Sequence, residues 1–178
     1  MFDKIITGIG AREVREEMSD LGWDLGRYIS DRNILFRTGD AKSGMDLAFL
    51  EGWVAGSKVG DCIVYGHYKS YSAKTVYSNL KSTDIEAYTK KVTSFKRLQT
   101  RNYFQVMGEI HSRKVPSDLV LFCARKLGGI YIGGTATTVS IAKEAGTIIM
   151  DLSECDRELI IATIEKINFK MEDDIIPF

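Results

Sequence analysis

Near its start the chain reads Lys4-Ile5-Ile6-Thr7-Gly8-Ile9-Gly10-Ala11-Arg12, and this stretch decides the fold. The run of β-branched residues predicts a short buried strand, and the two glycines that follow predict a tight turn. Over residues 12–30 apolar side chains recur at helical spacing, which predicts an amphipathic helix directly after the turn. A strand, a glycine turn and a helix together form the first half of a βαβ unit.

The same alternation continues to the end of the chain. Further strands are predicted over residues 34–37, 61–65, 118–123 and 147–152. Further helices are predicted over 45–55, from about 84 (a capping box), 101–112, 136–145 and 153–167. No Asn-Gly hairpin signal separates adjacent strands. We therefore expect a Rossmann-like, three-layer α/β/α fold with a mostly parallel sheet of five or more strands.

We expect one domain over residues 1–178, because no proline- or serine-rich linker divides the chain. Residues 66–115 are irregular and form a divergent insertion that could act as a lid. Tyr65, His67 and Tyr68 begin this stretch, at the edge where ligands bind, and could stack on a base or pack on the domain. Lys90, Lys91, Lys96, Arg97 and Arg101 form a basic run that is either a solvated helix face or a contact to a nucleic-acid backbone.

Composition narrows the class of protein. The 178 residues hold 24 basic and 24 acidic side chains, so the net charge is zero, which disfavours a protein that wraps duplex DNA. The three cysteines have no metal-ligand or paired spacing and are expected to be reduced thiols of a cytoplasmic protein. The two histidines, His67 and His111, also lack such spacing, so no metal is expected. No apolar run approaches the roughly 20 residues that span a bilayer, so no membrane association is expected.

Three glycine-rich turns follow predicted strands or short extended pieces and open helices. In a parallel sheet such turns meet at the carboxyl edge, where helix N-termini offer free N–H groups to anions. Each turn alone could be only a tight turn, but together they predict a phosphate site for a nucleotide, and no other cofactor is required. The candidate phosphate-binding residues are Gly8, Gly10, Ala11, Arg12, Thr38, Gly39, Ala41, Lys42, Ser43, Gly44, Gly133, Gly134 and Thr135. A complete Gly-x-Gly-x-x-Gly and a Walker A sequence are absent, which disfavours ordinary NAD binding and P-loop ATP hydrolysis.

These turns resemble those of the SLOG superfamily. Gly10-Ala11-Arg12 is similar to its Gly-Ser-Arg turn, and the residues from Phe36 to Asp46 resemble its Ser-Gly-Gly-Ala-x-Gly-x-Asp turn. Gly133-Gly134-Thr135 resembles its third phosphate-binding turn. The superfamily includes DprA/Smf DNA-processing proteins, LOG phosphoribohydrolases, and small phage and bacterial nucleotide-binding relatives. The resemblance spans roughly residues 5–152 and implies a nucleotide-binding Rossmann-like domain that commonly forms homo-oligomers.

Two departures from the superfamily affect the expected chemistry. The second turn carries Asp40 in place of a glycine, and this carboxylate would repel phosphate unless it points away or holds a cation. The third turn lacks the Pro-Gly-Gly-x-Gly-Thr-x-x-Glu of the LOG hydrolases, because Ile132, Ala136 and Ser140 stand at the proline, glycine and glutamate positions. The remaining candidate catalytic residues are Asp46 and Glu51, which could contact a ribose hydroxyl or simply balance the helix dipole and face solvent.

Three hypotheses for function follow. The leading one is a DprA-like module that binds a nucleotide or a nucleic-acid phosphate at the carboxyl edge of the sheet. The second is a nucleotide N-glycosidase or deoxyribosyltransferase-like hydrolase that uses Asp46 or Glu51. The third is a single-stranded DNA-binding recombination mediator, which would use the basic run together with the turns.

Overall fold

The computed structural model describes residues 2, 4–66, 93–108 and 115–169. Within them, five parallel strands form one sheet in the order β3-β2-β1-β4-β7. The strands are β1 (Ile5–Gly10), β2 (Leu35–Gly39), β3 (Asp61–Tyr65), β4 (Leu119–Cys123) and β7 (Ile148–Asp151). The Rossmann-like α/β fold predicted from the sequence is therefore confirmed.

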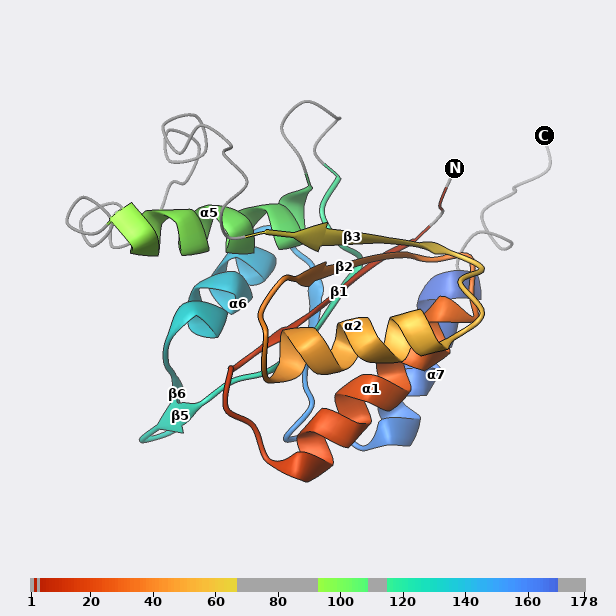
Figure 1. Cartoon of the computed structure of the whole chain (residues 1–178), viewed down its shortest axis with the longest axis horizontal. Coiled ribbons are helices and arrows are strands. Elements are labelled where there is room, and N and C mark those ends of the chain that lie inside the picture. Colours follow the sequence, from red (N-terminus) through yellow and green to blue (C-terminus); the bar gives the residue numbers. More distant parts are fainter. Residues whose placement is uncertain (1, 3, 67–92, 109–114, 170–178) are drawn as a thin grey trace.

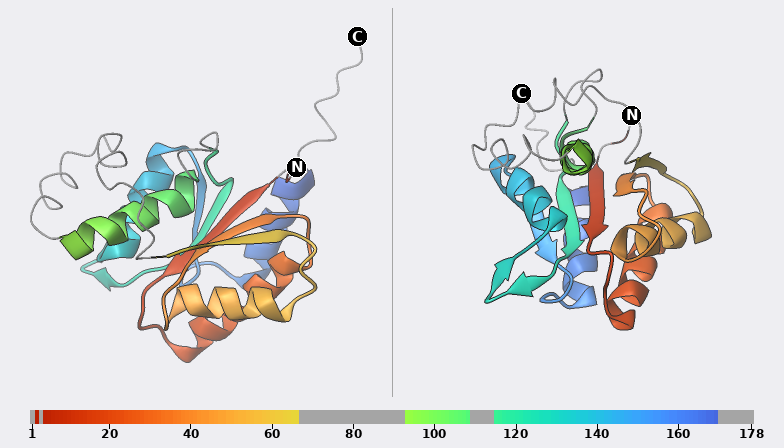
Figure 2. Two further views of the ribbon diagram at one scale, coloured as in Figure 1. Left: turned by 45° about the horizontal axis from the view of Figure 1, so that its top comes forward. Right: turned by 60° about the vertical axis from the view of Figure 1, so that its left-hand side comes forward.

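Helices cover both faces of this sheet (Figures 1 and 2). One face is covered by α1 (Glu16–Ser30), α2 (Met45–Ala55) and α7 (Arg157–Phe169). The other is covered by α5 (Thr93–Met107) and α6 (Gly134–Glu144). Alternate residues of β4 serve the two cores: Leu119 and Leu121 pack toward the first layer, Val120 and Phe122 toward the second.

The strand order places a topological switch point between β1 and β4. From β1 the chain proceeds outward through β2 and β3, and then returns to the other side of β1 to form β4 and β7. The connections that leave β1 and β4 therefore diverge, and they leave a crevice at the carboxyl ends of these two strands. This crevice is where the candidate site lies.

Glycines allow α1 and α2 to pack closely against each other. A Cβ on Gly26 would lie 2.2 Å from the carbonyl oxygen of Phe49, and a Cβ on Gly52 would lie 1.9 Å from that of Trp23. These helix-interior glycines are costly to helix formation by themselves, so their presence reflects the backbone contact. The contact fixes α2, the helix that carries Asp46, against α1 in the same layer.

Three sequence predictions need correction. A hairpin does exist: β5 (Lys126–Leu127) pairs antiparallel with β6 (Ile130–Tyr131), and the intervening Gly128 and Gly129 have φ of 57° and 80°. Two positive φ values are the requirement of a type I′ turn, which Gly-Gly meets as well as Asn-Gly. The helix predicted over 101–112 is α5, which begins at Thr93 and ends where Gly108 adopts φ 76°. The last helix begins at Arg157 rather than 153, because the Ser153 hydroxyl donates to Asp151.

Three further predictions concern a helix near residue 84, membrane-spanning helices and metal sites. The helix expected from about residue 84 lies outside the described residues. In the part of the chain that the structure describes, no helix is long and apolar enough to cross a membrane. The same described ranges contain no cluster of three or more potential metal ligands.

Candidate functional site

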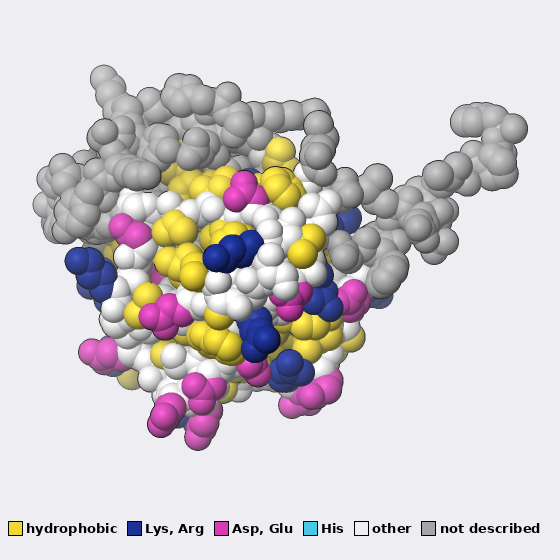
Figure 3. Space-filling view, turned by 45° about the vertical axis from the view of Figure 1, so that its right-hand side comes forward, with side chains coloured by type: hydrophobic (Ala, Val, Ile, Leu, Met, Phe, Trp, Pro, Cys, Tyr) yellow, Lys and Arg dark blue, Asp and Glu magenta, His cyan; other side chains and the backbone are white. Residues whose placement is uncertain are grey.

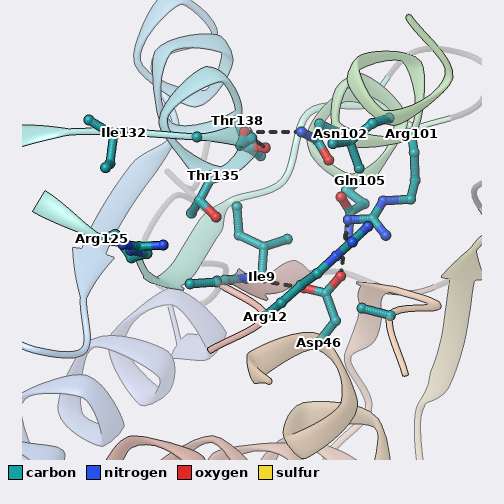
Figure 4. Close-up of a pocket in the computed structure, with 16 residues that line it drawn as sticks. Ile9, Arg12, Asp46, Arg101, Asn102, Gln105, Arg125, Ile132, Thr135 and Thr138 are labelled. Carbon is teal, nitrogen blue, oxygen red and sulfur yellow. Dashed lines mark hydrogen bonds and ion pairs between the residues drawn. The ribbon is translucent and has the colours of Figure 1, made fainter. Parts of the chain in front are cut away.

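A cavity of about 200 Å³ opens at the crevice between the carboxyl ends of β1 and β4 (Figure 4). Its walls come from the end of β1 and the turn after it, the start of α2, the middle of α5, the two residues that flank the hairpin and the start of α6. The lining residues are Ile9, Gly10, Ala11, Arg12, Ala41, Asp46, Leu98, Arg101, Asn102, Gln105, Arg125, Ile132, Gly133, Gly134, Thr135 and Thr138. All three predicted turns thus contribute to one cavity at the expected edge of the sheet.

The first turn contributes a side chain to the cavity rather than backbone amides. The N–H of Gly10 donates to Asp46 Oδ1 at 3.1 Å, and the N–H of Ala11 donates to the carbonyl oxygen of Cys123 at 2.9 Å. The expectation that these amides are available to an anion is therefore wrong. What the turn offers is the exposed guanidinium of Arg12.

The second turn closes on the first turn instead of facing the cavity. Gly44 caps α2 with φ 77°, and a Cβ there would lie 2.2 Å from the carbonyl oxygen of Ala11. The same oxygen accepts a hydrogen bond from the N–H of Met45 at 3.1 Å. Of the six residues predicted in this turn, only Ala41 lines the cavity, and Lys42 and Ser43 are exposed outside it.

Two further residues of that turn act through Asp46. Thr38 is fully buried and its hydroxyl donates to the backbone oxygen of Asp46 at 3.4 Å. At Gly39 the absence of a Cβ leaves room for side chains, since a Cβ would lie 2.1 Å from Asp46 Oδ2 and 2.9 Å from Gln105 Nε2. These residues shape the floor of the site without contacting its interior.

The third turn presents the N-terminus of α6 to the cavity. Gly133 caps the helix with φ 83°, and nothing lies within 4 Å of where its Cβ would be. The first N–H groups of a helix have no partner within it, and the helix dipole makes this end favourable for an anion. Asn102 Nδ2 donates to the carbonyl oxygen of Gly134 at 3.0 Å, which fixes the turn against α5.

Asp46 lies at the floor of the cavity and is 1% exposed. Its Oδ2 lies 3.1 Å from Arg101 Nη2, and the same guanidinium lies 3.5 Å from Asp40 Oδ1. Burial raises the pKa of Asp46, and the opposing effect of Arg101 is the largest that lowers it. Asp40 thus pairs with a cation, the guanidinium of Arg101. Such pairing is one of the two conditions, stated above, under which this carboxylate would not repel a phosphate.

Helix α5 supplies functional side chains that the sequence analysis did not place in the site. Arg101, Asn102 and Gln105 lie one and four residues apart and share the face of α5 that lines the cavity. Arg101 had been grouped with a basic run, but its side chain is 10% exposed and paired with carboxylates. Arg125 and Thr138 were missed as well. The available signal was the i, i+1, i+4 spacing of polar residues within the predicted 101–112 helix.

Several predicted residues lie elsewhere. A Cβ on Gly8 would meet the rings of Phe36 and Phe49 at 2.7 Å and 2.8 Å, so this glycine serves core packing. Tyr65 is 4% exposed and stacked on Phe104, which leaves its ring in the core. Glu51 is exposed and does not line the cavity. His67 and Tyr68 lie outside the described residues.

The fold and the crevice define a Rossmann-like α/β protein with a cavity at the switch point of its sheet, lined by three arginines among other residues. Comparison with protein-family models and with curated proteins finds no match. Among solved structures, the chain is similar to DNA processing protein A from Helicobacter pylori, which is described for its single-stranded DNA binding mode. The TM-score is 0.54 at 13% sequence identity, over 93% of this chain and 74% of that one. This likeness is one of fold.

Proposed function

We propose that the cavity binds a phosphate group of a nucleotide or of single-stranded nucleic acid. The observation that carries this proposal is the pair Arg12 and Arg125, which line the same cavity as the N-terminus of α6. Neither makes an ion pair with any residue that the structure describes. In Figure 4, Arg125 lies on one side of Ile9 and Arg12 on the other. Guanidinium groups and helix N-termini are both favourable partners for phosphate oxygens.

The positive charge is local to this site. The described residues that line the cavity include three arginines and one carboxylate, that of Asp46, although the whole chain has no net charge. On the face shown in Figure 3, which is turned toward the right-hand side of Figure 1, basic and acidic side chains are interspersed. A local cluster on a neutral protein favours binding of one or a few phosphates over non-specific binding to duplex DNA.

The structure supports binding better than hydrolysis. Glycoside hydrolases ordinarily use two carboxyl groups that flank the scissile bond. Asp46 is the single carboxylate among the described lining residues, and its two oxygens are engaged by Gly10 and Arg101. Glu51, the other candidate, does not reach the cavity. We therefore propose no catalytic role for either residue.

Arg12→Ala is expected to weaken binding of a 5′-phosphorylated oligothymidylate roughly tenfold or more, because a hydrogen bond to a charged group contributes about 1.5–3 kcal/mol. The matched control is Arg15→Ala, since Arg15 follows closely in the chain, is exposed, pairs with Glu17 and does not line the cavity. Fluorescence anisotropy at two salt concentrations measures both affinity and its salt dependence. Equal affinities for the two variants would show that the cavity is not the phosphate site.

The same titration separates a free nucleotide from a strand. If the ligand is a single strand, the oligothymidylate binds more tightly than thymidine 5′-monophosphate, and its affinity falls as salt rises because counterions are released along the strand. If the ligand is a free nucleotide, lengthening the chain adds no affinity. In both cases Arg12→Ala reduces binding. The comparison of the two ligands therefore identifies the ligand class, and the Arg12→Ala variant tests separately whether the cavity is the binding site.

A further inference from the structure

Gln105 has a buried side-chain amide that faces the cavity. The residue is 0% exposed, and neither Nε2 nor Oε1 has a hydrogen-bond partner among the described residues. Its backbone is held in place, because the hydroxyl of Thr7 donates to the Gln105 carbonyl oxygen at 2.6 Å. Figure 4 shows the side chain between Asn102 and Asp46, beside Arg101.

An amide in this position is unfavourable unless something pairs with it. Buried polar groups nearly always find partners, and a group left without one destabilises the folded protein. Leucine would fill a similar volume without polar atoms. Because the side chain lines a cavity, the missing donor and acceptor can come from a ligand that enters it.

We infer that Gln105 recognises the base of the bound nucleotide through the hydrogen-bonding edge of that base; this rests on the proposed function. A carboxamide presents one donor group and one acceptor side by side. A phosphate supplies acceptors to the cavity but no strong donor, so it leaves Oε1 unpaired. A base edge supplies both groups in one plane, which is the pattern that glutamine pairs with in nucleic-acid recognition.

The rest of the cavity is arranged for this division of roles. Arg125 and the start of α6 offer a positive charge and N–H groups, which suit a phosphate. Gln105 and Leu98 lie on α5, and Ile9 lies at the end of β1. Leu98 and Ile9 are apolar side chains that also line the cavity and can contact the face of a ring. The ligand would therefore place its phosphate toward α6 and its base toward α5.

The test compares ligands that have a base with one that has none, in wild type and in Gln105→Leu. The probes are the four deoxynucleoside 5′-monophosphates and 2-deoxyribose 5-phosphate, measured by calorimetry. We expect wild type to bind the best monophosphate roughly tenfold more tightly than the sugar phosphate, and Gln105→Leu to abolish most of that difference while keeping its affinity for the sugar phosphate. Gln99→Leu is the matched control: Gln99 is also on α5, is 1% exposed and has an amide without a partner among the described residues, but it does not line the cavity.

A second readout excludes a purely structural role. Removal of an unpaired buried amide is expected to raise the Tm of the ligand-free protein by a few degrees, whereas loss of a structural hydrogen bond would lower it. The inference is overturned if Gln105→Leu keeps the preference for base-bearing ligands, if it lowers the Tm, or if wild type shows no such preference. If wild type binds neither the monophosphates nor the sugar phosphate, the proposed function itself fails, and the inference fails with it.

Discussion

Arg101→Met is expected to lower the free energy of unfolding by about 3–5 kcal/mol at pH 7, the cost of removing one partner from a buried ion pair. The substitution keeps an unbranched side chain of similar length but leaves the carboxylate of Asp46, which is 1% exposed, without the guanidinium 3.1 Å away. Urea unfolding followed by circular dichroism measures the change.

Two further variants show whether the loss of stability in Arg101→Met comes from the unpaired carboxylate of Asp46. Arg101→Met combined with Asp46→Asn should recover most of the lost stability, since it removes the charge that was left unpaired. Arg12→Met, which removes an exposed arginine of the same cavity, should change stability by no more than about 0.5 kcal/mol. A double variant as unstable as Arg101→Met alone would show that Arg101 contributes by packing and not by charge.

The dependence on pH gives an independent check of the same pair. Burial raises the pKa of Asp46 above its ordinary value of 3.8. The folded protein therefore takes up this proton more readily than the unfolded chain, so the contribution of Asp46 to stability rises as pH falls through the folded pKa toward 3.8. Loss of Arg101 raises the pKa of Asp46 further, so the penalty of Arg101→Met should shrink in mild acid. A penalty that stays constant with pH would contradict this assignment.

The strands and the turns that follow them could be predicted from the sequence because their signals are local. Runs such as Ile5-Ile6-Thr7 before Gly8 specify a buried strand and a turn within a few residues, and the alternation of elements specifies a parallel sheet. The parallel sheet then brings turns that are far apart in sequence to one edge, which is why residues from all three turns meet at the cavity.

The use of each turn could not be predicted, because it depends on contacts between distant backbones. A glycine beside a helix start is compatible with anion binding and with close packing, and nothing local distinguishes the two. Gly44 proved to pack on Ala11, whereas Gly133 opens on the cavity. The contribution of α5 could not be predicted for the same reason. Arg101 lies close to Gly39 only because the chain crosses the sheet between them, and no local sequence signal indicates that contact.

Gly44→Ala and Gly133→Ala make this distinction measurable, and the first is expected to be much the more damaging. The two glycines have nearly the same backbone angles, φ 77° and ψ −152° against φ 83° and ψ −166°, and each caps a helix. In this region an alanine costs about 1–3 kcal/mol at either position. Only at Gly44 does the new methyl group also meet backbone, 2.2 Å from the carbonyl oxygen of Ala11.

We therefore expect Gly133→Ala to lower the free energy of unfolding by about 1–3 kcal/mol. Gly44→Ala should lower it by about 2 kcal/mol more than that, a total loss comparable to that of a severe core substitution. Urea unfolding gives both values, and anisotropy with the phosphorylated oligothymidylate gives the affinities of whichever variants stay folded. Gly133→Ala should fold and lose phosphate affinity, because the strain falls on the turn that opens α6 to the cavity. Equal losses of stability would mean that the second turn can move away from Ala11, and that Gly44 is not required for their close packing.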